Sequence, residues 1–431
     1  MIGTSQGGRF LPIDLAGAGK RVALVERDHL GGVRVNTGCT PTKTMVAGAR
    51  VAQLARRAAE YGVRTGPVSV DLAAVRERKA ATVAGAREDY VSRLAQDGLD
   101  LIEGQAGFTG PKTVEVAMED GGTRTLGAPV IIVDAGARSR PLTLDGARDV
   151  PVLDSTSIME LEESPEHLII LGGGHIGLEF GQMFRRFGSE VTIVQTRPRL
   201  LMAEDDDISD AVADNLRDDG IAVLTSAQPE RVEGAGGGRL RLPLGTVEGE
   251  RWIEGSHLLS AIGRVPDTEA LAPDAAGIRL DDRGFIEVDA YLETSVPGVY
   301  AMGDVKGGPA FTHLSYDDYR ILFDPQFGRV GISERQSTEQ NRAVRIAKLP
   351  MGAVVRAIEA GERRGFMKAV VDADTRQILG AAVLGAEGGE ITSVIQVAML
   401  GKLTVDDMAN AVFTHPLLAE GLNSLFGTVN E

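Results

Sequence analysis

The chain has 431 residues, 43% of them hydrophobic and 25% charged, an ordinary globular composition with length for two to four domains. Its net charge of −16 argues against a nucleic-acid backbone or an anionic membrane surface as partner. One cysteine excludes a disulfide-stapled secreted fold, and the lack of a signal-like or bilayer-spanning apolar run predicts a cytoplasmic protein.

A glycine-rich turn opens the chain and leads into an apolar strand, KRVALVE. Gly3 and Gly8 hold the outer positions of a G-x-G-x-x-G pattern, and Glu26 ends the strand 23 residues after Gly3. This order predicts a βαβ unit whose turn lies against the pyrophosphate of a dinucleotide and whose acidic residue binds a ribose.

Several residues depart from that pattern and predict weakened nucleotide binding. Ser5 replaces the middle glycine, so a side chain would intrude where the phosphate approaches. Pro12 and Asp14 are expected to interrupt the first helix, because an interior proline costs about 3 kcal/mol or more. Only Met1 and Ile2 precede the turn, so the first strand is expected to be almost absent.

The only cysteine, Cys39, lies in GGVRVNTGCTPTK, where a two-cysteine redox centre would read C-x4-C. The partner position, five residues upstream, is Arg34. A single thiol cannot form an intramolecular disulfide, so a dithiol mechanism within one chain is excluded.

The second glycine-rich turn is intact. A buried strand is predicted at Leu168 to Leu171, and Gly172, Gly174 and Gly177 then complete G-x-G-x-x-G. LEFGQMFRRFG has the apolar spacing of a helix, and EVTIV is the next predicted strand. The arrangement predicts a second dinucleotide-binding unit, in which the three glycines provide a tight turn, phosphate access and close packing.

The end of that second strand bears on the choice of nicotinamide cofactor. Gln195 lies 23 residues after Gly172, at the position where an NAD-binding unit usually has an acid. A neutral amide does not repel a 2′-phosphate, and Arg197 and Arg199 would attract one, which favours NADPH over NADH. The alternative is that both arginines are solvated loop charges.

The last third of the chain has the pattern of a small α+β domain. GFMKAVVDADTRQILGAAVLG predicts a β-hairpin, and EITSVIQVAMLGKL predicts a helix. The connection between Asp317 and FDPQFGRVGISE is short, so the sheet of this domain is expected to lack a strand or to have an exposed edge. Six histidines without ligand spacing and one cysteine predict no metal site.

Taken together, these motifs resemble the flavoprotein pyridine nucleotide-disulfide oxidoreductases, on the mercuric reductase-like and dihydrolipoamide dehydrogenase-like branch. The resemblance covers essentially the whole chain and includes AGARSRP, SAIGRVPDT, TSVPGVYAMGDV and FTHPLLAEGLN. It implies an α/β fold with two Rossmann-like domains and an α+β interface domain, FAD, NADPH or NADH, and a homodimer. The implied domains are residues 1–146 and 261–322 for FAD, 147–260 for NAD(P) and 323–431 for the interface.

The resemblance also implies roles for individual residues. Cys39 matches the thiol next to the flavin, Lys43 the lysine beside flavin N5, and Glu179 its ion-pair partner. His175 departs from the usual aromatic gate over the nicotinamide pocket. The implied cofactor-binding residues are Gly3, Gly8, Glu26, Gly31, Gly32, Gly136, Gly172, Gly174, Gly177, Gln195, Arg197, Gly263, Arg264, Gly303 and Asp304.

His415 and Glu420 match the acid–base dyad of the family, which serves the redox centre of the other subunit. A histidine titrates near neutral pH, and a carboxylate can fix its tautomer. With Arg34 in place of the second thiol, however, the dyad has no thiol to deprotonate. The alternative is that His415 and Pro416 form a turn at a dimer interface.

Three functions remain open. The favoured one is an FAD-dependent NAD(P)H oxidoreductase that passes hydride to a small acceptor, such as a quinone, a dye, oxygen or a small electrophile, without disulfide chemistry. The second is a single-thiol enzyme in which Cys39 cycles through a sulfenate or a mixed disulfide. The third is a dimeric nucleotide-binding protein without catalysis.

Overall fold

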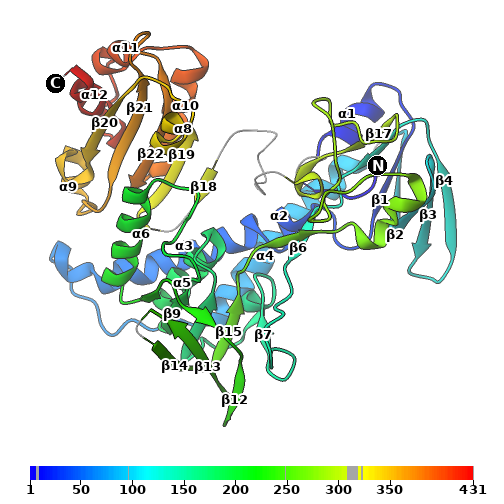
Figure 1. Cartoon of the computed structure of the whole chain (residues 1–431), viewed down its shortest axis with the longest axis horizontal. Coiled ribbons are helices and arrows are strands. Elements are labelled where there is room, and N and C mark those ends of the chain that lie inside the picture. The colour runs from blue at the N-terminus through cyan, green and yellow to red at the C-terminus, as the bar shows by residue number, and fades with distance from the viewer. Residues whose placement is uncertain (6–8, 96, 248, 308–318, 322–323, 431) are drawn as a thin grey trace.

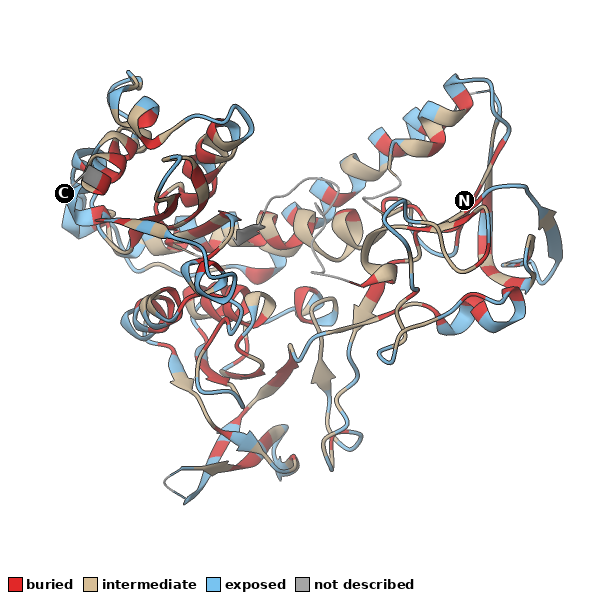
Figure 2. Ribbon diagram, turned by 45° about the horizontal axis from the view of Figure 1, so that its top comes forward, coloured by how far each residue is buried: buried red, intermediate tan, exposed pale blue. Residues whose placement is uncertain are grey.

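The computed structural model describes residues 1–5, 9–95, 97–247, 249–307, 319–321 and 324–430. Three regions, each built on β-sheet, surround long central helices (Figure 1). Buried residues gather on the sheets and on the helix faces packed against them (Figure 2). Across these residues, no helix is both long and apolar enough to cross a membrane.

The N-terminal region begins with β1 (Val22–Glu26), which pairs in parallel with β2 (Leu99–Gly110). β2 continues into an antiparallel meander with β3 (Thr113–Met118) and β4 (Thr123–Gly127). The predicted strand KRVALVE is therefore confirmed, and Glu26 lies at its carboxyl end.

Ile2 takes the place of the first strand. It forms parallel bridges to Val25 of β1 and to Val133 of β5 (Ile131–Val133), which pairs in turn with β17 (Val299–Ala301). The Ile2 N–H donates to Ile132 at 2.8 Å, and its carbonyl accepts from Asp134 at 2.7 Å. The expected loss of the strand is confirmed only in its length, because one residue is enough to join β1 to β5.

The prediction that Pro12 interrupts the first helix is wrong. α1 (Leu11–Gly17) begins just before this proline, which lies in the first turn, where its missing N–H has no intrahelical acceptor to lose. Asp14 also lies in the first turn, where a carboxylate is favoured by the helix dipole. The helix is only seven residues long because it begins well after the glycine turn.

The central helix, α3 (Cys39–Arg56), packs among all three regions. It follows the short α2 (Gly32–Asn36) and lies against α4 (Leu72–Leu94) and α5 (His175–Phe187). A single hydrophobic cluster contains residues of α3, of the second region and of the C-terminal region: Met45, Ala49, Leu178, Phe184, Phe327, Phe366 and Leu384. α3 ends at Arg56 and is followed by a 3-10 turn over Ala58–Tyr61.

The second region has a five-stranded parallel sheet with the order β10-β9-β8-β15-β7. Both strands predicted around the second glycine turn are present, and α5 follows that turn as expected. The strands and the other helix of this layer are β7 (Val152–Leu153), β8 (His167–Leu171), β9 (Glu190–Val194), β10 (Ala222–Leu224), β15 (His257–Ser260) and α6 (Asp206–Asp218).

Smaller elements extend these two regions. A second sheet beside the parallel one contains β11 (Gln228–Pro229), β12 (Glu233–Gly236), β13 (Arg239–Thr246) and β14 (Gly249–Gly255). A two-stranded connection back to the N-terminal region pairs β6 (Ala137–Ser139) with β16 (Arg264–Pro266), and α7 (Pro273–Ala276) follows.

The C-terminal region has an antiparallel sheet with the order β18-β19-β22-β21-β20. The hairpin and the helix predicted there are confirmed as β21 with β22 and as α10. The prediction that this sheet lacks a strand is wrong, because the three-residue β18 pairs with β19 at the edge, whereas the alternative of an exposed edge stays a prediction. The elements are β18 (Tyr319–Ile321), β19 (Gln326–Gly331), α8 (Glu334–Glu339), β20 (Val344–Pro350), α9 (Val355–Glu359), β21 (Phe366–Asp372), β22 (Ile378–Gly385), α10 (Gly388–Leu400), α11 (Val405–Asn410) and α12 (Gly421–Gly427).

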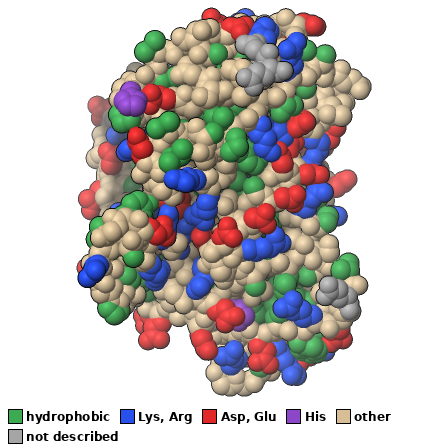
Figure 3. Space-filling model, turned by 90° about the vertical axis from the view of Figure 1, so that its left-hand side faces the viewer, with side chains coloured by type: hydrophobic (Ala, Val, Ile, Leu, Met, Phe, Trp, Pro, Cys, Tyr) green, Lys and Arg blue, Asp and Glu red, His purple; other side chains and the backbone are tan. Residues whose placement is uncertain are grey.

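A buried lysine fixes the C-terminal region to the second region. Lys368 of β21, with a side chain only 4% exposed, contacts Asp205 at 3.1 Å, Asp207 at 3.2 Å and Glu334 at 2.6 Å. Asp205 also accepts the backbone N–H groups of Glu334 and Arg335 at the start of α8. Elsewhere on the surface, acidic and basic side chains are interspersed, as on the face shown in Figure 3.

Replacing Lys368 should loosen this contact. Lys368→Met would remove the buried cation that Asp205, Asp207 and Glu334 share, and we expect a loss of about 3 kcal/mol in the free energy of unfolding. Lys348→Met is the matched control, because Lys348 contacts Asp207 from the surface and should cost at most about 1 kcal/mol. Urea unfolding followed by circular dichroism measures both, and equal losses would contradict the assignment.

Candidate active site

Glu26 is held at the carboxyl end of β1 by four N–H or O–H donors. Its Oε2 accepts the Thr4 N–H at 3.0 Å and the Thr4 hydroxyl at 2.5 Å. Its Oε1 accepts the N–H groups of Arg27 and Asp28. The Thr4 hydroxyl in turn accepts the Gly31 N–H at 2.9 Å, so one side chain joins the first glycine turn, β1 and the start of α2. Thr4 was not predicted from the sequence as a site residue.

Asp134, also missed by the sequence analysis, lies beside Ser5. It follows β5 directly, is 1% exposed and accepts a hydrogen bond from the Ser5 hydroxyl. A Cβ on Gly3, which has φ +90°, would lie 2.3 Å from the Asp134 carbonyl oxygen. A Cβ on Gly303 would lie 2.9 Å from the Asp134 carboxylate. Ser5 thus stands at the middle-glycine position with its hydroxyl bonded to this carboxylate.

These residues line a cavity of about 450 Å³, within the usual range for a ligand site. The cavity brings together predicted residues from four separate segments, and Arg34 also lies in its wall. The wall includes Gly3, Thr4, Ser5, Glu26, Gly32, Arg34, Asp134, Gly136, Gly303 and Asp304. Glycine backbone at the predicted phosphate positions and a fixed carboxylate at the predicted ribose position fit FAD.

Asp304 and Arg264 lie together at one side of the cavity. Their side chains approach to 3.8 Å, and the Arg264 guanidinium donates to the Ala137 carbonyl. Burial raises the pKa of Asp304, and the positive charge of Arg264 opposes that shift. Gly263, directly before Arg264, has φ +116°, a conformation that glycine adopts readily.

The first turn of α3 and the first turn of α5 meet through an ion pair. Cys39 begins α3, and Lys43, one turn later, pairs with Glu179 of α5. His175, one turn before Glu179, begins α5. Burial, with the charge of Lys43 adding to it, lowers the pKa of His175 to about 4, so this imidazole is neutral at pH 7. The two helices therefore bring together two of the predicted catalytic residues, Lys43 and Glu179, and Cys39 lies one turn from Lys43 on α3.

The second glycine turn has the geometry that its pattern predicts. A Cβ on Gly172 would lie 2.3 Å from the Ala261 carbonyl oxygen, and a Cβ on Gly177 would lie 2.1 Å from the Gly172 carbonyl oxygen. A Cβ on Gly174 would meet nothing within 4 Å. The outer glycines are thus required by packing, and the middle one leaves open space at the start of α5.

Gln195 and Arg197 follow β9 beside this turn. The Gln195 amide donates to the Arg199 carbonyl at 3.3 Å, and the Arg199 guanidinium pairs with Asp206. Arg197 is exposed and forms no ion pair with any residue that the structure describes. Of the two arginines, Arg197 is therefore the one available to a ligand phosphate.

His415 and Glu420 form a pair near the C-terminus. The His415 Nδ1 lies 3.0 Å from the Glu420 carboxylate, which also accepts the Leu417 N–H at 2.9 Å. These two contacts lower the pKa of Glu420. The His415 side chain is 74% exposed.

Gly8, one of the predicted cofactor-binding residues, lies outside the described residues.

No group of three or more His, Cys, Asp or Glu side chains able to hold a metal occurs within the part of the chain that the structure covers.

The fold and the site define a class of flavin- and nicotinamide-dependent oxidoreductase. Residues 1–318 match the family described as pyridine nucleotide-disulphide oxidoreductase, and residues 319–426 match its dimerisation domain. The chain belongs to this family, which uses FAD and takes electrons from NAD(P)H. The predicted fold class and cofactors are thereby confirmed.

Curated relatives span the whole chain. The probable pyridine nucleotide-disulfide oxidoreductase RclA of Escherichia coli (strain K12) is 34% identical over 100% of this chain and 98% of its own length. The dihydrolipoyl dehydrogenase of Thermus scotoductus is 33% identical over 98% and 95%, and the mercuric reductase of Staphylococcus aureus 32% over 94% and 77%.

A solved structure has the same fold as this chain. The Cu(II) complex of the HOCl-induced flavoprotein disulfide reductase RclA from Escherichia coli superposes with a TM-score of 0.90 at 33% identity, covering 99% of this chain and 98% of that one.

Thr4 offers a direct test of the cofactor cavity. Thr4→Val keeps the shape of the side chain but removes the hydroxyl that joins Glu26 to Gly31, and we expect FAD to bind about tenfold more weakly. Fluorescence titration of the apoprotein with FAD measures the affinity. Thr338→Val removes a hydroxyl bonded to the Glu334 carbonyl on an exposed helix and should leave FAD affinity unchanged. An unchanged affinity in Thr4→Val would remove Thr4 from the site.

Proposed function

We propose that this protein is an NAD(P)H oxidoreductase that passes hydride through FAD to a small acceptor without a redox disulfide. One observation carries the proposal: Arg34 stands at the second thiol position, while the cofactor cavity and the Lys43–Glu179 pair are both present. A chain with only one cysteine retains the residues suited to reducing a flavin and lacks those needed to reduce a disulfide internally.

When bound, FAD would accept hydride from nicotinamide and pass electrons onward. The chain's own residues would bind and orient the two cofactors. Glu26, fixed by four donors, is suited to a ribose, and the open backbone at Gly174 is suited to a pyrophosphate. Glu179 fixes Lys43, which would place a positive charge at the reactive end of the flavin. The neutral His175 adds no second positive charge there.

For the acceptor we propose an organic molecule or oxygen rather than a metal ion. RclA is described as a Cu(II) complex, but the described residues of this chain contain no cluster of three metal ligands. We also propose a homodimer, because residues 319–426 match a dimerisation domain. The single cysteine favours a reducing compartment, and we therefore place the protein in the cytoplasm.

A second candidate is single-thiol chemistry at Cys39. Cys39 begins α3, and reactive cysteines are typically found at the start of a helix or beside a cation. Lys43, one turn along, is such a cation. Here the Cys39 thiolate would attack a disulfide substrate, forming a mixed disulfide and expelling the other half of the substrate as a thiolate. Alternatively, it would take one oxygen from a peroxide, which leaves as an alcohol or water, and become a sulfenate. In both cases a second thiol would be needed to restore Cys39.

Replacing Cys39 separates the two candidates. In Cys39→Ser, anaerobic NADPH should still bleach the flavin absorbance bands, and turnover with a quinone should stay within about twofold of the wild type, because hydride transfer needs no thiol. Lys43→Met, which breaks the pair with Glu179, should slow bleaching at least tenfold. Intact bleaching with turnover lost in Cys39→Ser would favour the single-thiol candidate. A wild-type protein that binds no FAD would overturn both.

The nicotinamide preference can be tested at Arg197. We propose NADPH, and Arg197→Ala should raise the KM for NADPH about tenfold while leaving that for NADH unchanged, because only NADPH has the 2′-phosphate. Arg199→Ala is the matched control, since its guanidinium is already paired with Asp206. Steady-state kinetics with both cofactors measure the split. Equal effects on the two KM values would show that Arg197 does not read the phosphate.

A further inference from the structure

A second cavity lies where the C-terminal ends of three helices meet. It has a volume of about 160 Å³ and shares no lining residue with the cofactor cavity. Its wall comes from the ends of α3, α5 and α6 and consists of Gln53, Arg56, Arg185, Arg186, Gly188 and Asp219. Three arginines thus surround a space the size of a small ion, in a chain whose net charge is −16.

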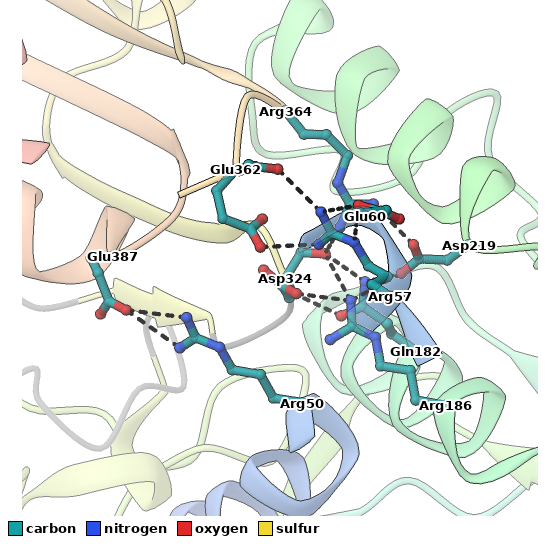
Figure 4. Close-up of polar contacts among 11 residues, drawn as sticks. Arg50, Arg57, Glu60, Gln182, Arg186, Asp219, Asp324, Glu362, Arg364 and Glu387 are labelled. Carbon is teal, nitrogen blue, oxygen red and sulfur yellow. Dashed lines mark hydrogen bonds and ion pairs between the residues drawn. The ribbon is translucent and has the colours of Figure 1, made fainter. Parts of the chain in front are cut away.

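The one acid in the wall, Asp219, already accepts three hydrogen bonds from side chains other than Arg56 and Arg185. Its Oδ2 accepts from Gln182 at 2.7 Å and from Arg186 at 3.1 Å, and its Oδ1 accepts from Arg364 at 2.9 Å. Figure 4 shows these side chains converging on Asp219, together with Asp324 of the C-terminal region. Asp219 therefore has little capacity left to neutralise Arg56 or Arg185.

Arg56 and Arg185 retain free donors. Arg56 donates one bond, from Nη1 to the Arg186 carbonyl. Arg185 donates from Nε to the Asp219 carbonyl at 3.0 Å and from Nη1 to the Ser189 carbonyl at 3.3 Å. Each guanidinium has five N–H donors, so both can bind a further acceptor without giving up these bonds.

Arg186 anchors the wall of the cavity. This residue is 3% exposed, and its Nη2 is paired with both Asp219 and Asp324. The charge of Arg186 is therefore balanced by two acids, and the donors available to a ligand come chiefly from Arg56 and Arg185.

The partial charges of the helix ends do not cancel the preference of this cavity for an anion. Carboxyl ends of helices carry a partial negative charge, which by itself disfavours anions. At two of the ends, however, the carbonyls of Arg186 and Asp219 already accept bonds from Arg56 and Arg185. Because Arg186 is paired with Asp219 and Asp324, the guanidinium groups of Arg56 and Arg185 are the two charges in the wall that no carboxylate of the wall contacts.

We propose that this cavity binds a small oxyanion of the phosphate or sulfate class. A bound oxyanion would accept from Arg56 of α3 and from Arg185 and Arg186 of α5. Because Arg186 also contacts Asp324, the site would connect α3, the second region and the C-terminal region. This site is separate from the proposed redox function, and neither depends on the other.

Calorimetric titration of the FAD-loaded protein with inorganic phosphate tests the proposal, with sodium chloride at equal ionic strength as the reference. The experiment is done in the Arg197→Ala background, which removes the other phosphate contact that we propose. We expect one site per chain. Arg56→Gln should weaken it at least tenfold, and Gln53→Glu, which places a carboxylate in the wall, should abolish it.

Arg217→Gln is the matched control, because Arg217 is an exposed arginine of α6 whose one ion pair among the described residues is with Asp214. Its replacement should not change the phosphate affinity. The absence of a phosphate-specific heat would overturn the proposal, as would equal affinity in the wild type and Gln53→Glu. Gln53→Glu removes no hydrogen bond between described residues, so it keeps the test decisive if Arg56→Gln fails to fold.

Discussion

The position of α3 is the constraint on which the rest of the structure depends. Its middle is buried through Met45 and Ala49 in a hydrophobic cluster shared with the second and C-terminal regions. Its first turn is tied to α5 by Lys43 and Glu179, and its last turn by Arg56 and the Arg186 carbonyl. Because α5 follows the second glycine turn directly, fixing α3 against α5 also fixes Cys39 relative to the proposed nicotinamide site.

The C-terminal region reaches the same helix from outside. Arg50 pairs with Glu387, and Arg57 pairs with Glu362 (Figure 4). The Arg50 pair is exposed and contributes little, whereas Arg57 is less exposed and also bonds the Gly361 carbonyl. The packing of α3 therefore comes chiefly from apolar burial, and the ion pairs set its register against its neighbours.

Local patterns predicted the elements that depend on local sequence. The strand before Gly172, the hairpin of β21 and β22, and α10 all follow from periodicity and turn residues. The bridging role of Ile2 depends instead on β1 and β5, which are distant in sequence. The three-residue β18 is likewise stabilised by pairing with β19 rather than by its own pattern.

The residues of the cofactor cavity were also predictable only where they belong to a local sequence motif. Glycines and charged residues in known motifs could be found, and the structure brings Glu26, Gly303 and Asp304 to one cavity. Thr4 and Asp134 could not be found, because their importance lies in contacts with Glu26 and Ser5 that no spacing reveals. Pro12 was misjudged because the helix starts later than the glycine turn, which converts an interior proline into a first-turn proline.

The two glycine turns show how the first one accommodates Ser5. A Cβ added to Gly3 or to Gly172 would lie at the same 2.3 Å from a carbonyl oxygen. In each turn that carbonyl belongs to the residue directly after a neighbouring parallel strand, Asp134 after β5 and Ala261 after β15, so both turns close in the same way. In the second turn, Gly174 leaves open space, and in the first, the Ser5 hydroxyl is bonded to Asp134. That bond holds the Ser5 hydroxyl at a buried carboxylate. Gly136, where a Cβ would meet nothing within 4 Å, offers open backbone in the wall of the cofactor cavity.

Arg34 then separates two halves of the chemistry that usually occur together. Reduction of a flavin calls for the cofactor cavity and the Lys43–Glu179 pair, neither of which uses a second thiol. Reduction of a disulfide calls for two thiols, and the chain has one. A guanidinium in the cavity wall cannot exchange with a disulfide, but it leaves the first half intact. We therefore propose that only the step that hands electrons to a disulfide is lost, and that electrons pass from the flavin directly to an acceptor.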